Sequence, residues 1–166
     1  PELPLVFSGS LCDIGLDLSA TSMITEAGPD MNFRTVSSDF YACGQVTEAD
    51  LQAAADKGFK SLIINRPDNE GPGQPTAAET TAAAEVLGLE VRYIPLVSGQ
   101  LTPDHIEQTR AALTEMPKPI LGHCLSGMRS VMLWALANRG EMSADEIIEA
   151  AAGAGFDLNG LRPRLS

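Results

Sequence analysis

A histidine, a cysteine, an arginine and a serine lie close together in the segment HCLSGMRS, residues 123–130. The thiolate of a cysteine such as Cys124 is a nucleophile, and the planar guanidinium of Arg129 suits an oxyanion with two or more oxygens. Between them, Gly127 lets the chain turn so that several backbone N–H groups face one cavity. The segment therefore predicts a nucleophile, an oxyanion cradle and a positive clamp within one loop.

The other residues of this segment have expected roles of their own. His123 should orient the loop, because its side chain points away from the face of the strand that carries Cys124. Ser130 could donate a hydrogen bond to the leaving thiolate, cap the following helix, or do both. The residues expected to contact substrate are Leu125, Ser126, Gly127 and Met128, together with Arg66 from another loop. An apolar rim of leucine and methionine disfavours a highly charged substrate.

The elements that must position this loop alternate along the chain from residue 33 onward. Short runs rich in β-branched and aromatic residues predict strands, and capping boxes, prolines and glycines delimit the helical patterns. Strands are expected over 33–36, 40–43, 60–65, 91–97 and 119–124, and helices over 48–57, 76–88, 104–116, 130–140 and 143–152, with an irregular tail over 156–166. The alternation predicts an α/β domain with a mostly parallel sheet and helices on both faces. Cys124 follows a strand, at the edge where such sheets bind ligands.

HCLSGMRS resembles the signature loop of cysteine-dependent phosphatases, which reads HC, several residues, then R and S or T. From residue 31 to about 137 the chain also resembles the bacterial phosphatase-like domain family of beta-lactamase-hydrolase-like proteins, a family also described as sulfur transferases. Four motifs fall in order: CGQ at 43–45, NRPDNEGPGQP at 65–75, YIPLVSGQLTP at 93–103, and HCLSGMRS with LWALA at 123–137. The resemblance implies a dual-specificity-phosphatase-like fold and a hydrolase that acts on a phosphate monoester through a cysteinyl-phosphate.

Two departures from the phosphatase signature keep other functions open. Four residues separate Cys124 from Arg129, where the signature has five, and a tighter cradle suits a persulfide better than a phosphoryl group. The loop over 95–100 also has no carboxylate, although those phosphatases carry their general acid there. A sulfurtransferase with a persulfide on Cys124 and a non-catalytic anion-binding module therefore stand beside the phosphatase-like hydrolase, which we take as the first hypothesis.

The loop over 65–75 offers substitutes for the missing acid. Asp68 and Glu70 follow a buried strand and should lie at the same sheet edge as Cys124. Asp68 could act as the catalytic acid, or it could be a turn residue after a proline. Arg66 could add to the anion site or pair with Asp68. Cys43 could be a resolving thiol or simply a small apolar residue.

Composition limits the remaining possibilities. The chain has 166 residues and a formal net charge of −11, and 5% of its residues are aromatic, so nucleic-acid and membrane partners are not expected. Three cysteines without metal-ligand spacing predict neither a disulfide framework nor a metal site, and a cytoplasmic location fits. No cofactor is expected, and the substrate should be a small anion, either a phosphate monoester or a sulfane sulfur donor. Protein partners are left open.

The first thirty residues differ from the rest. They have no lysine or arginine and no sustained hydrophobic period. We predict that residues 1–30 are an extension, either a linker, a packed arm or a vector-derived segment. The phosphatase-like domain should then cover residues 31–166.

Overall fold

The computed structural model describes residues 33–166, so the extension predicted for residues 1–30 lies outside the described part and its boundary stays a prediction. The strands are β1 (Arg34–Thr35), β2 (Phe40–Cys43), β3 (Ser61–Ile64), β4 (Glu90–Tyr93) and β5 (Ile120–His123). The helices are α2 (Glu48–Asp56), α3 (Ala77–Val86), α4 (Pro103–Glu115), α5 (Met128–Ala137), α6 (Ala144–Gly153), the 3-10 helix η2 (Asn159–Leu161) and α7 (Arg162–Leu165).

The five strands form one sheet in the order β1-β2-β5-β3-β4. Strand β5 is central and pairs in parallel with β2 and β3, β4 is parallel to β3, and only β1 is antiparallel to its neighbour. In this register Cys43 of β2 and Ile64 of β3 both lie beside His123 of β5. The carboxyl ends of the three strands therefore meet at one edge, and Cys124 is the next residue along the chain. The predicted mostly parallel sheet is confirmed.

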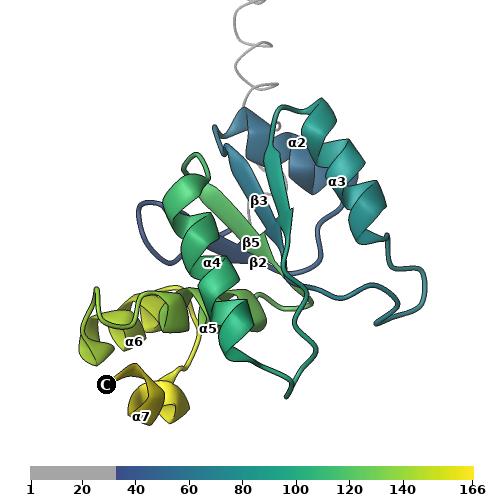
Figure 1. Cartoon of the computed structure of the whole chain (residues 1–166). Helices are drawn as coiled ribbons and strands as arrows, with labels where there is room; N and C mark the ends of the chain where they lie inside the picture. The colour runs from purple at the N-terminus through teal and green to yellow at the C-terminus, as the bar shows by residue number, and fades with distance from the viewer. Residues whose placement is uncertain (1–32) are drawn as a thin grey trace, which may run out of the picture. The chain divides into compact units, whose positions relative to one another are not determined.

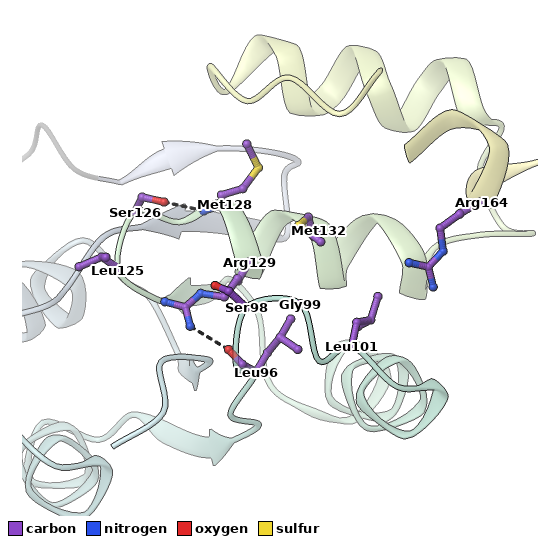
Figure 2. A pocket seen from close by; sticks show the side chains of 10 residues that line it. All are labelled: Leu96, Ser98, Gly99, Leu101, Leu125, Ser126, Met128, Arg129, Met132 and Arg164. Atoms are coloured by element: carbon purple, nitrogen blue, oxygen red, sulfur yellow. Dashed lines mark hydrogen bonds between the residues drawn. The ribbon is translucent and has the colours of Figure 1, made fainter. Parts of the chain in front are cut away.

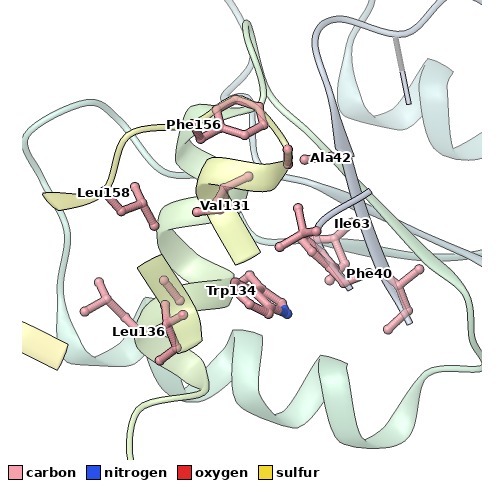
Figure 3. Close-up of a cluster of buried hydrophobic side chains, with 14 of the residues drawn as sticks. Phe40, Ala42, Ile63, Val131, Trp134, Leu136, Phe156 and Leu158 are labelled. Carbon is pink, nitrogen blue, oxygen red and sulfur yellow. The ribbon is translucent and has the colours of Figure 1, made fainter. Parts of the chain in front are cut away.

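Helices cover both faces of the sheet, as predicted, with α2 and α3 on one side and α4, α5 and α6 on the other (Figure 1). Each side has its own buried apolar cluster. The cluster on the side of α5 and α6 contains Trp134 of α5, which is 3% exposed and stacks on Phe40 with ring centroids 6.1 Å apart (Figure 3). On the other face, Leu62 and Leu121 are buried under α2 and α3. Trp134 is therefore a core residue.

Local sequence signals account for most of the helix ends. Thr47, Thr76 and Ser143 each accept a hydrogen bond from the third amide of the helix that follows, so capping boxes set the starts of these three helices. Strand β4 ends at Tyr93, before the predicted limit, although the N–H groups of Ile94 and Leu96 still donate to the carbonyl oxygens of Ile64 and Asn65 at the end of β3.

The tail predicted to be irregular over 156–166 instead forms η2 and α7. Leu158 and Leu165 are buried there and join the cluster that surrounds α5. Tertiary burial therefore stabilises helices that are too short for their sequence pattern to reveal. Within residues 33–166, no helix combines the length and the apolar character that crossing a bilayer requires.

Candidate active site

Cys124 lies in the turn that joins β5 to α5. It is 1% exposed, and its Sγ accepts a hydrogen bond of 3.1 Å from the backbone N–H of Gly127. Gly127 is the N-cap of α5 with φ 96°, a left-handed conformation that favours glycine. The sulfur thus lies at the N-terminus of a ten-residue helix, where the helix dipole and the free amides stabilise negative charge.

The turn after β2 supports this loop from behind. The Cys124 N–H donates to the carbonyl oxygen of Cys43 at 3.4 Å. A Cβ built on Gly44 would lie 2.9 Å from the carbonyl oxygen of Leu125, so only glycine allows this close approach of the two backbones. Burial, with smaller contributions from the charges of Asp50 and Cys124, raises the pKa of the Cys43 thiol well above its usual range. Cys43 is therefore a protonated, buried neighbour of the loop in this structure.

Arg129 is clamped by residues from two other loops. Its Nη1 and Nη2 donate to the two carboxylate oxygens of Glu70 at 2.7 and 2.8 Å, and Nη1 also donates to the Leu96 carbonyl oxygen at 2.8 Å. These bonds use both hydrogens of Nη1 and one hydrogen of Nη2. Within residues 33–166, the Nε–H and the second Nη2–H, which form the edge of the planar guanidinium not used by Glu70, have no oxygen acceptor and can face an anion.

Glu70 is shared by two guanidinium groups. Arg66 Nε donates to Glu70 Oε1 at 3.0 Å, and Arg66 Nη1 donates to Gln45 at 2.8 Å. The hydrogen bond from Arg129, followed by that from Arg66, lowers the pKa of Glu70 to about 2 against the opposing effect of desolvation. Arg66 therefore pairs with Glu70 rather than with Asp68. Because Glu70 is ionised at neutral pH, it cannot serve as a proton donor there.

Asp68 makes its contacts away from the Cys124 loop. Its Oδ1 accepts a hydrogen bond of 2.6 Å from the N–H of Ala77, the first residue of α3, and its own N–H donates to Tyr93 Oη at 3.1 Å. Within residues 33–166 it has no hydrogen bond or ion pair with the loop. This geometry favours the structural alternative, and a catalytic role for Asp68 stays a prediction.

Ser130 lies in the first turn of α5 and is buried. Its Oγ donates to Asn65 Oδ1 at 2.8 Å, and the Asn65 amide donates to the Ile94 carbonyl oxygen at 2.9 Å. The alternative that Ser130 caps α5 is wrong, because Gly127 is the N-cap. Asn65 was not among the predicted site residues. A polar residue directly after a buried strand, at the sheet edge that binds ligands, was the available signal.

His123 is 2% exposed, and neither ring nitrogen has a hydrogen-bond partner within the described residues. Burial lowers the pKa of His123 to about 4, although the nearby Cys124 backbone opposes part of this shift, so the imidazole is neutral at pH 7. Its expected role in orienting the loop stays a prediction. Among residues 33–166, no group of three or more histidine, cysteine or acidic side chains is placed to hold a metal ion.

A pocket of about 450 Å³ opens beside the loop, and Figure 2 shows the residues that line it. The loop residues Leu125, Ser126 and Met128 form part of its wall, and Arg129 lies at its inner side. The side chain of Leu125 is 57% exposed, which gives the pocket the apolar rim expected from the sequence.

Residues 32–141 match the family model described as "Beta-lactamase hydrolase-like protein, phosphatase-like domain". The beta-lactamase hydrolase-like protein of Xylella fastidiosa (strain Temecula1) is 34% identical over 117 residues, which are 69% of this chain and 27% of that protein. The protein of the same description from Agrobacterium fabrum is 32% identical over the same shares of each chain. The chain thus spans 27% of the length of these curated relatives.

The solved structures that share this fold include proteins described as phosphatases. A candidate phosphatase of Neisseria meningitidis has a TM-score of 0.72 and 31% identity, covering 80% of this chain and 95% of that chain. The catalytic core of the S. cerevisiae PP-IP phosphatase has a TM-score of 0.61 and 17% identity, and the match covers 81% of this chain and 83% of that chain. The second likeness shows the fold alone. The fold is that of dual-specificity and tyrosine phosphatases, as the signature loop predicted.

Proposed function

Because the chain belongs to the phosphatase-like domain family of the beta-lactamase hydrolase-like proteins, we propose that it hydrolyses phosphate monoesters with Cys124 as nucleophile. The observation that carries this proposal is the hydrogen bond from the Gly127 N–H to Cys124 Sγ at the N-terminus of α5. It provides a stabilised sulfur at the point where several loop amides can also hold an anion.

The Cys124 loop and Arg129 would supply the nucleophile and the groups that stabilise charge in this reaction. The Cys124 thiolate attacks phosphorus, the S–P bond forms, and the P–O bond to the leaving group breaks. The free edge of Arg129 and the amides of the loop would hold the phosphoryl oxygens as charge moves between attacking and leaving atoms. Water then attacks the cysteinyl-phosphate, releases inorganic phosphate and restores the thiolate.

Among the described residues, neither candidate carboxylate is placed to protonate the leaving oxygen. Glu70 is ionised and held by two arginines, and Asp68 is bonded to the Ala77 amide. A general acid typically contributes about 10²–10⁴-fold to the rate. We therefore propose that the protein acts on esters with good leaving groups, and that Asp68 contributes only where it exchanges its bond to Ala77 for one to the substrate.

Sulfur transfer is the second candidate, and the short loop favours it. With four residues between Cys124 and Arg129, the amide of Gly127 already reaches the sulfur, which leaves less room for a phosphoryl group than for one added sulfur atom. In this reaction the thiolate attacks the outer sulfur of a donor such as thiosulfate, a cysteine persulfide forms, and sulfite leaves. An acceptor thiolate or cyanide then removes the outer sulfur.

Steady-state rates distinguish the two. The wild-type chain should hydrolyse a series of aryl phosphates, with rates that rise steeply as the pKa of the leaving phenol falls. Cys124→Ser should abolish hydrolysis, while Cys43→Ser, the matched change at the other described cysteine, should retain it. Transfer of sulfur from thiosulfate to cyanide without any aryl phosphate hydrolysis would select the second candidate. Anion binding without either reaction would leave a binding module.

A further inference from the structure

The pocket beside the Cys124 loop extends away from the reacting atoms and has a cation at each end. Arg129 stands at the loop, and Arg164 of α7 reaches toward α5 and α4 at the end farther from Leu125 (Figure 2). Between the two guanidinium groups the wall is largely apolar and includes Leu101 and Met132. The volume of about 450 Å³ lies within the range of sites that enclose small molecules.

Arg164 differs from the other arginine of α7 in what it contacts. Arg162 donates to Asp145 of α6 at 2.6 Å, and buried Leu165 packs into the cluster around α5, so the short helix is anchored on both sides of Arg164. Arg164 itself has no hydrogen bond or ion pair with any residue of the described part of the chain. Its backbone is therefore held in place while its charge is available.

The electrostatics of the pocket are unusual for this chain. The formal net charge is −11, yet none of the ten residues that line the pocket is acidic, and its two charged residues are both arginines. At the Arg129 end, Glu70 balances one edge of the guanidinium from the far side. At the Arg164 end, none of the residues that line this pocket carries a carboxylate, although Arg164 also lines a neighbouring pocket that contains Glu107. A ligand with an anion at each end and an apolar middle matches this distribution.

We propose that the pocket binds a phosphate ester whose apolar body runs over Met132 and Leu101 and ends in a second anionic group held by Arg164. The proposal rests on the proposed function only for the identity of the first anion, which sits at Cys124 and Arg129. Arg164 would then determine specificity without touching the reacting atoms. Arg164 lies in residues 142–166, beyond the range that matches the family model.

Equilibrium binding of non-hydrolysable phosphonates to the full chain tests this without requiring turnover. The probes are alkylphosphonates of increasing chain length that end in a carboxylate, each paired with the same molecule ending in a carboxamide. At the best length the wild-type chain should bind the carboxylate about fivefold tighter than the carboxamide, the scale of one partly exposed ion pair. Arg164→Gln should reduce this ratio to about one.

The matched control is Lys60→Gln, which removes one positive charge at the amino end of β3, the sheet edge opposite the site. It should keep the fivefold preference. A ratio near one at every length in the wild-type chain, a preference that survives in Arg164→Gln, or no binding of any phosphonate would overturn the proposal. Aryl phosphate hydrolysis measured beside it reports separately on the proposed function: a chain that hydrolyses these esters but shows no preference refutes only the second anion site, and the reverse refutes only catalysis.

Discussion

Glu70→Gln tests the ion pair that holds Arg129 in place. The substitution keeps the size of the side chain but removes the charge that faces Arg129 and Arg66. In the folded chain the pKa of Glu70 falls from 4.5 to about 2, which corresponds to about 3 kcal/mol before solvent is considered. The Glu70 side chain is 26% exposed, so screening reduces the expected loss of unfolding free energy at pH 7 to about 1–2 kcal/mol.

The pH dependence of this loss follows from the direction of the shift. Because the pKa of Glu70 is lower in the folded than in the unfolded chain, the stabilisation is complete above pH 4.5 and is lost as pH falls toward 2. Urea denaturation of the wild-type chain and of Glu70→Gln at a series of pH values measures the difference directly. The two unfolding free energies should differ at pH 7 and converge in acid.

Glu115→Gln is the matched control, because Glu115 also pairs with an arginine, Arg92 at 2.7 Å, but is 60% exposed. It should cost less than about 0.5 kcal/mol. Equal losses in the two variants, or a difference for Glu70→Gln that does not shrink toward pH 2, would refute the view that Glu70 and Arg129 form a strongly coupled pair.

Three further predictions concern the loop and the core. The pKa of His123 is about 4 when folded and about 6.5 when unfolded, so unfolding experiments should show the wild-type chain losing about 2–3 kcal/mol more than His123→Gln as pH falls from 6.5 to 4. Gly44→Ala should displace the Leu125 backbone and lower both stability, by about 1–3 kcal/mol, and turnover, whereas Gly160→Ala, with open space around the new methyl group, should change neither. Trp134→Ala should cost about 3–5 kcal/mol in urea denaturation, and a loss below 1 kcal/mol would contradict its place in the core.

The sequence predicted the elements whose signals are local. Capping boxes set the starts of α3 and α6, and the buried run before Cys124 set the central strand. The chemistry of the Cys124 loop was also local, because nucleophile and arginine lie in one short segment. The start of α5 was placed two residues late, since Gly127 caps the helix through its backbone conformation rather than through a side chain.

Interactions between distant loops could not be predicted in the same way. Glu70 and Arg129 are 59 residues apart, and the loop that carries Glu70 has no hydrophobic period from which its path could be inferred. The sequence therefore offered Glu70 as an acid, where the structure shows an ionised partner of Arg129. Helix α7 was missed for a related reason, because the burial of Leu165 depends on the packing around α5.

Mass spectrometry of the chain quenched in acid during turnover of an aryl phosphate tests the central claim most directly. The proposed mechanism predicts one added phosphoryl group on the peptide that contains Cys124, its absence from the peptide that contains Cys43, and its disappearance in Cys124→Ser. Phosphate release that continues in Cys124→Ser, or a phosphoryl group found on another residue during turnover, would contradict the assignment of Cys124 as the nucleophile.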